Sequence, residues 1–144
     1  MSGVQAKRVD QQRKPKSGNG LQQAVLAAVV TSLANLLVMV GAKALGVTFL
    51  MPGPAGELMP LAWPFVVTAS ALPALLAPAV YGLFRRLVMG NPLRTFRITA
   101  AVLLVLSFAL PFVAGGAQAD IATKLTLNLM HVVSAVGILL IVKE

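Results

Sequence analysis

Four long runs of this 144-residue chain contain no Asp, Glu, Lys or Arg, and this pattern constrains the fold more than any other feature. The runs are residues 24–42, 61–84, 98–114 and 125–142. Each run is close to the roughly 20 apolar residues that an α-helix needs to cross the hydrocarbon of a bilayer. Short connections make successive helices antiparallel neighbours. The sequence therefore predicts an all-α integral membrane protein, an up-down four-helix transmembrane bundle.

The composition supports a lipid environment rather than water. Only 11% of the residues are charged and 58% are apolar, whereas soluble domains carry about 25% charged residues. The net charge is +8, but the basic residues lie in two clusters that flank apolar runs. No interleaved aromatic residues and no nucleic-acid-binding motif accompany these clusters. We therefore expect the lipid bilayer, and not nucleic acid, to be the partner of the basic residues.

The two basic clusters predict the orientation in the membrane. Residues 1–20 are polar and basic, which is typical of a disordered tail. The second cluster lies between the second and third runs, where it is expected at the lipid headgroups; it comprises Arg85, Arg86, Arg94 and Arg97. Four spans place both clusters on one side, and the positive-inside rule makes that side the cytoplasm. We expect both termini to be cytoplasmic (N-in/C-in) and the membrane to be the bacterial inner membrane.

Local signals set the predicted boundaries. The membrane domain is expected over residues 21–144, with helices over about 22–45, 60–89, 92–114 and 121–142. Gly90 suits the position after a helix, Asn91 an N-cap, and Pro92 the first helical position. Asp120 is expected to cap the fourth helix. Pro and Gly residues between 46 and 60 predict a turn.

The fourth run carries a polar stripe and the chain's one histidine. Asn128, His131 and Ser134 are spaced by three residues, which places them on one helical face. A polar stripe at bilayer depth is expected to face the bundle interior rather than lipid. Asn35 lies at a similar depth in the first run, which makes it a candidate hydrogen-bond partner for His131.

This cluster has two interpretations. The favoured one is that neutral His131 and Asn35 satisfy each other across a helix interface and only strengthen packing. The other is that His131 binds a haem, a quinone or a proton, because ionisable groups inside a membrane are often functional. A haem would need a second axial ligand from a partner chain, since this chain has one histidine. The sequence leaves the cofactor unidentified.

Catalytic chemistry is poorly supported. The chain has no cysteine, which excludes thiolate catalysis and Cys-ligated metals. Its four acids are Asp10, Glu57, Asp120 and Glu144, and none lies at mid-membrane. No carboxylate pair is available for acid–base catalysis and none orients a Ser-His pair. We predict no catalytic residues, no metal ligands and no enzymatic activity.

Several short motifs together resemble a known family. They are Gly46-Val47 after the first run, Arg86, Asn91, Pro92, Arg94 and Phe96 in the basic turn, Leu-Ser-Phe-Ala-Leu-Pro at 106–111, and Leu129-Met130-His131. Over residues 22–142 the chain resembles a family of small bacterial four-helix membrane proteins, a domain of unknown function. The resemblance implies the same four-span topology and marks His131. It implies no activity.

Three functions remain open at this stage. The leading hypothesis is a non-enzymatic structural or accessory protein, either a subunit of a larger membrane complex or a homo-oligomer. The first alternative is a quinone, haem or other small-molecule site centred on His131. The second is a small transporter, although the spans hold no acidic side chain to line a cation pathway.

Overall fold

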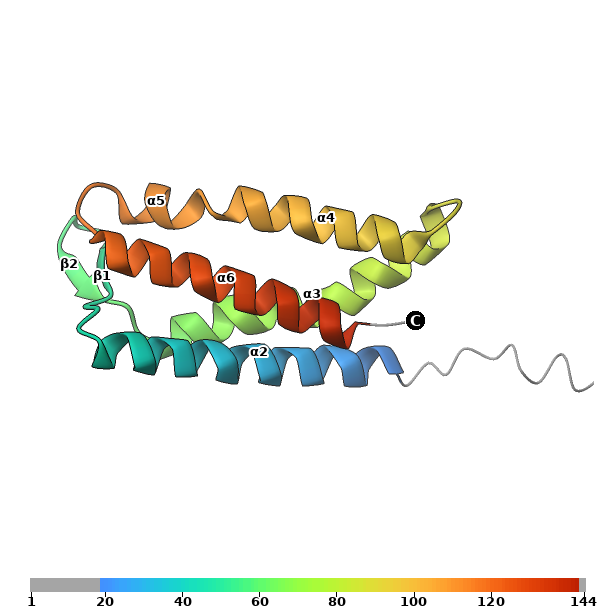
Figure 1. Ribbon diagram of the computed structural model, residues 1–144, viewed down its shortest axis with the longest axis horizontal. Coiled ribbons are helices and arrows are strands. Elements are labelled where there is room, and N and C mark those ends of the chain that lie inside the picture. The colour runs from blue at the N-terminus through green and yellow to red at the C-terminus, as the bar shows by residue number, and fades with distance from the viewer. Residues whose placement is uncertain (1–18, 143–144) are drawn as a thin grey trace, which may run out of the picture.

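The computed structural model describes residues 19–142, and its elements follow one another around a bundle (Figure 1). They are α2 (Asn19–Ala44), β1 (Leu50–Pro52), β2 (Leu58–Pro60), α3 (Trp63–Leu87), α4 (Pro92–Ser107), α5 (Leu110–Gly115) and α6 (Ile121–Ile141). The predicted tail, residues 1–20, lies outside the described residues except for Asn19 and Gly20, which begin α2.

Four helical segments of the described chain are long and apolar enough to cross a membrane. They are Gly20–Ala44, Trp63–Leu87, Pro92–Gly115 and Ile121–Ile141. Successive segments run in opposite directions, so the start of α2, the α3–α4 turn and the end of α6 share one end of the bundle (Figure 1). The β1–β2 hairpin and the α5–α6 loop lie at the other end. The predicted up-down four-helix bundle is confirmed.

Small residues bring α2 against its neighbours. The buried positions of α2 recur every three or four residues, and so do those of α3. On α2 they include Ala24, Ala27, Ala28, Thr31, Ser32 and Asn35; on α3 they are Val66, Ser70, Ala74, Ala77 and Tyr81. Such stripes let helix backbones approach closely in a membrane. As a result, α2 makes its most extensive contacts with α3 and α6.

The third span consists of two helices rather than the one predicted over 92–114. Between α4 and α5, the amides of Phe108 and Ala109 bond to the carbonyls three residues earlier, at 3.2 and 3.3 Å. The cause is Pro111, which has no N–H to bond the Ser107 carbonyl and whose ring crowds that oxygen. The helix therefore tightens before the proline and restarts at Leu110.

A short hairpin closes the end opposite the α3–α4 turn. β1 and β2 pair antiparallel, with Met51 opposite Met59, where the sequence indicated only a turn. Just before β1, Phe49 has a φ of 53°, a conformation that costs a non-glycine residue about 1–2 kcal/mol. The Phe49 side chain is fully buried against Met39, Val66 and Met130. Its burial stabilises the strained backbone and attaches the hairpin to the bundle.

The predicted N-caps are confirmed. Asn91 Oδ1 accepts a hydrogen bond from the Arg94 amide at 2.9 Å, and Pro92 begins α4. Asp120 Oδ1 accepts from the Thr123 amide at 2.6 Å at the start of α6. Gly90 does not directly follow the helix as predicted, because α3 ends at Leu87 with Val88 as its C-cap. It lies in the turn with a φ of 126°, which a glycine adopts without steric cost. These residues set where the chain reverses direction.

Candidate functional site

A cavity of about 690 Å³ lies between α3 and α4–α5, with α6 and one residue of α2 also lining it. It exists because α3 passes obliquely behind α6, from α2 near the hairpin to α4 at the α3–α4 turn (Figure 1). Its volume is within the range of about 300–1,000 Å³ that small-molecule sites occupy.

The mouth of the cavity is apolar. Phe65 and Leu76 of α3 and Leu103 and Leu110 of α4–α5 line it and are more than half exposed, at 64, 54, 59 and 57%. No Asp, Glu, Lys or Arg is among the residues that line the cavity within residues 19–142. An uncharged rim of this kind suits contact with lipid hydrocarbon rather than with water.

A polar group from α2 lies at the inner side of the cavity. Asn35 is 2% exposed, and its Nδ2 donates to Ser70 Oγ of α3 and Ser134 Oγ of α6, each at 2.8 Å. The Ser70 hydroxyl itself donates to the Val66 carbonyl at 2.7 Å. Ser70 Oγ can therefore only accept from Asn35, which fixes the orientation of the amide. Three helices are joined through this one side chain.

The amide orientation leaves Asn35 Oδ1 without a hydrogen-bond partner. Asn128 Oδ1 on α6 is also buried and unpartnered. An unsatisfied buried acceptor costs about 1–3 kcal/mol. Asn35 lines the cavity and Asn128 does not, but both oxygens are enclosed by protein atoms, so neither is presented to a ligand.

The imidazole of His131 also lines the cavity. Its Nδ1 lies 2.7 Å from the Leu127 carbonyl, one turn earlier on α6. A carbonyl oxygen only accepts, so Nδ1 carries the proton of this bond. In the neutral ring Nε2 then bears a lone pair, able to accept a hydrogen bond or to ligate a metal.

The structure groups the predicted polar residues only in part. Asn35, His131 and Ser134 line the same cavity, whereas Asn128 does not. The candidate bond between Asn35 and His131 does not form, because the Asn35 amide bonds two serines and His131 bonds its own helix. Interhelical geometry, which residue spacing along one helix does not reveal, decided these partners.

Sequence reasoning missed a further polar group at Ala69. Pro73 has no amide proton, so it cannot donate to the Ala69 carbonyl one turn earlier on α3. Both residues line the cavity. A proline inside a transmembrane helix indicates from sequence alone that the carbonyl four residues earlier lacks its helical donor. The sequence does not show whether that side of the helix faces a cavity.

The four arginines lie at the end of the bundle that holds the α3–α4 turn. All four are exposed: Arg85, Arg86, Arg94 and Arg97. The first two are in the last turn of α3, where a positive charge stabilises the helix dipole. Arg94 is in the first turn of α4, where it opposes the dipole. Its position is therefore not explained by helix stability.

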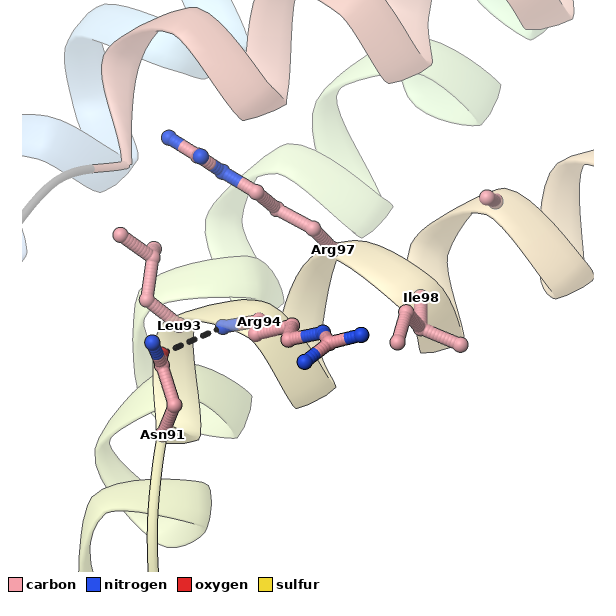
Figure 2. A pocket seen from close by; sticks show the side chains of 6 residues that line it. Asn91, Leu93, Arg94, Arg97 and Ile98 are labelled. Atoms are coloured by element: carbon pink, nitrogen blue, oxygen red, sulfur yellow. Dashed lines mark hydrogen bonds between the residues drawn. The ribbon is translucent and has the colours of Figure 1, made fainter.

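A second, shallow cavity of about 290 Å³ borders this turn. Asn91, Arg94 and Arg97 contribute its polar groups (Figure 2). The guanidinium groups of Arg94 and Arg97 extend in different directions in Figure 2 and do not converge on one point. This arrangement suits several separate headgroup contacts better than one clamped anion.

At the opposite end, Asp120 links the start of α6 to the first loop. Its carboxylate accepts from the Thr123 amide and hydroxyl, at 2.6 and 2.8 Å, and from the Thr48 hydroxyl at 2.9 Å. The bond from the Thr123 backbone contributes most to lowering the pKa of Asp120, followed by the two hydroxyls. Among residues 19–142, no group of three His, Cys, Asp or Glu side chains is placed to hold a metal ion.

Comparison with known families places the chain in one of them. Residues 15–144 match a family described as a family of unknown function (DUF6069). The chain belongs to this family. The resemblance noted from the sequence motifs is thereby confirmed, and the family description carries no activity. No curated protein and no solved structure matches the chain.

Proposed function

We propose that this protein binds a small, largely apolar molecule that enters the α3/α4–α5 cavity from the lipid phase. The observation that carries the proposal is the combination of an uncharged, lipid-facing cavity of about 690 Å³ with polar groups of Asn35 and His131 along its inner side. A cavity that served only as a packing gap would not need polar atoms there, since lipid chains would fill it without them.

The favoured reading of the polar cluster as helix-packing contacts explains the Asn35–Ser70–Ser134 bonds. It does not explain why His131 bonds no neighbouring helix within residues 19–142. This feature supports ligand binding. The accessory-subunit and transporter roles stay predictions.

Within the ligand-binding class, haem receives less support than an uncharged molecule. His131 would supply one axial ligand through Nε2. The other candidate ligand, Met130, is 5% exposed and packs with Met39, Phe49 and Val66. A molecule held only by hydrogen bonds needs no second ligand.

A cavity-filling variant tests the proposal. Ala100 of α4 lines the cavity, and Ala100→Phe would fill part of it without replacing a polar side chain. Val102, two residues further on the same helix, is 52% exposed and does not line the cavity, so Val102→Phe is the matched control. Native mass spectrometry and lipid-extract analysis after gentle purification would quantify the bound small molecule.

We expect a small molecule in fixed ratio with the wild type and Val102→Phe, and its loss from Ala100→Phe. The same small-molecule content in all three proteins, or none in the wild type, would refute the proposal.

The arginine distribution also supports an orientation. We propose that the end bearing the α3–α4 turn, with all four arginines, faces the cytoplasm of a bacterial inner membrane. The opposite end, formed by the hairpin and the α5–α6 loop, carries Lys43, Glu57, Asp120 and Lys124, which balance in charge. Anionic lipid headgroups would then interact with Arg94 and Arg97.

A further inference from the structure

Every side-chain N–H group that lines the cavity within residues 19–142 already donates to another protein atom, whereas acceptor atoms without a donor remain. Both Nδ2 protons of Asn35 are donated to serine hydroxyls, and the Nδ1 proton of His131 is donated to the Leu127 carbonyl. These are the only side-chain N–H groups among the lining residues within 19–142. Of the acceptors on these two side chains, Asn35 Oδ1 is enclosed by protein atoms, so His131 Nε2 is the one left for a ligand.

His131 lies close to the polar contact between α2 and α6. Asn35 bonds Ser134 at 2.8 Å. Ser134 lies three residues after His131 on α6, which places the two residues on adjacent turns of one face. His131 is therefore about one helical turn from the Asn35–Ser134 hydrogen bond.

A second acceptor comes from α3. Pro73 deprives the Ala69 carbonyl of its helical donor, and both residues line the cavity. The hydroxyls of Thr99 and Ser134 can rotate to donate or accept, so they do not decide the polarity of a ligand. The groups that cannot rotate, on α3 and α6, thus present lone pairs.

A surplus of acceptors in an apolar site selects a hydrogen-bond donor. A ligand carbonyl, ether or ester could accept only from the rotatable hydroxyls and would leave His131 Nε2 without a donor. A ligand hydroxyl could donate to His131 Nε2. An acyl chain would fill the space without donating to it.

We propose that the ligand is a hydrophobic molecule with a hydroxyl head, an isoprenoid or long-chain alcohol or a quinol, and that its hydroxyl donates to His131 Nε2. The inference rests on the proposed function and adds the chemical class of the ligand. It excludes the oxidised quinone as the preferred occupant, because a quinone presents only carbonyl oxygens.

The single histidine gives a direct test in the native chain. Protein labelled with ¹⁵N-histidine and reconstituted in lipid nanodiscs shows one Nε2 resonance, which shifts upfield when that nitrogen accepts a hydrogen bond. Farnesol and farnesyl methyl ether are the matched probes, since they differ only in the donor. We expect farnesol to bind roughly threefold to tenfold more tightly, the worth of one hydrogen bond, and to shift the Nε2 resonance, while the ether does not.

Decyl-ubiquinol and decyl-ubiquinone form the second pair and separate phenols from alcohols. The quinol is expected to bind more tightly than the quinone, and the tighter of quinol and farnesol identifies the source of the hydroxyl. His131→Leu should abolish the preference for the donor. Asn128→Leu, on the same helix but outside the cavity lining, should retain it.

Equal binding of farnesol and its ether, or tighter binding of the quinone, would overturn the donor inference and leave the proposed function standing. No binding of any probe would overturn both. An Nε2 resonance already at its hydrogen-bonded position without ligand, and unmoved by farnesol, would show that water occupies the site and would also overturn the inference.

Discussion

Gly137 is the position where a single methyl group should most clearly disturb the bundle. A Cβ placed on Gly137 of α6 would lie 2.7 Å from Thr31 Cγ2 of α2. Carbon atoms pack at about 3.5–4.0 Å, so the overlap in Gly137→Ala is about 1 Å. Thr31 is fully buried and its hydroxyl donates to the Ala27 carbonyl at 2.7 Å. Rotating the threonine away would break that bond, so α2 and α6 must separate instead.

The expected loss of stability follows from three terms. Overpacking of this kind costs about 1–3 kcal/mol. The Asn35–Ser134 hydrogen bond, one turn from Gly137, would be strained at a further cost of about 0.5–1.5 kcal/mol. Alanine offsets about 1 kcal/mol through its higher helix propensity. Gly137→Ala should therefore destabilise the protein by roughly 0.5–3.5 kcal/mol.

Equilibrium unfolding in mixed detergent micelles would measure the change in the free energy of unfolding caused by Gly137→Ala, with two other glycines as controls. A Cβ on Gly41 of α2 or Gly82 of α3 meets nothing within 4 Å, so alanine there should be neutral or stabilising. Thr31→Ser keeps the hydroxyl and removes the clashing methyl, so it should restore most of the loss when combined with Gly137→Ala. If Gly137→Ala were as stable as Gly41→Ala, the close approach of α2 and α6 would be refuted.

Three further predictions concern the ends of the bundle. Phe49→Ala should lower stability by about 3–5 kcal/mol through the lost core contact, and unchanged unfolding would contradict the anchoring of the hairpin. The lowered pKa of Asp120 stabilises the fold above about pH 4, and this contribution is lost as the pH falls through the lowered value. The stability difference between wild type and Asp120→Asn should therefore shrink as the pH falls from neutral through the lowered pKa, and a constant difference would show that the charge is irrelevant. The chain has no cysteine, so single cysteines can report the orientation. A membrane-impermeant thiol reagent applied to right-side-out vesicles should label Ala55→Cys in the hairpin and should not label Met89→Cys in the α3–α4 turn. The reverse pattern would show that the proposed orientation is wrong.

Much of the fold could be predicted because backbone chemistry leaves few choices in lipid. Uncharged runs of about 20 residues must form helices there, since unpaired amides and carbonyls are too costly. The caps at Asn91 and Asp120 followed from the side-chain chemistry of helix ends. The hairpin was missed because its two strands have three residues each, too few to show an alternating pattern.

The candidate site was predictable in part. Asn35, His131 and Ser134 were recognisable as polar residues at bilayer depth, and they do line one cavity. Asn128 has the same spacing on α6 but lies outside the lining. The role of Ser70, which orients the Asn35 amide by donating its own proton to Val66, depends on a contact between helices. Such a contact has no signature in either helix alone.

By itself, the sequence determined that the chain spans a membrane four times, where its helices are capped and at which end its arginines gather. Each of these depends on local chemistry: apolar length, backbone hydrogen bonding and side chains at helix ends. The tertiary structure alone decided that α3 diverges from α4–α5, that a cavity opens between them and that His131 lines it while its Nδ1 bonds its own helix. The physical reason is that lipid is as apolar as the helix surfaces, so hydrophobicity does not rotate one helix against another. Close contacts such as Gly137 against Thr31, and hydrogen bonds that form only between helices, set that geometry.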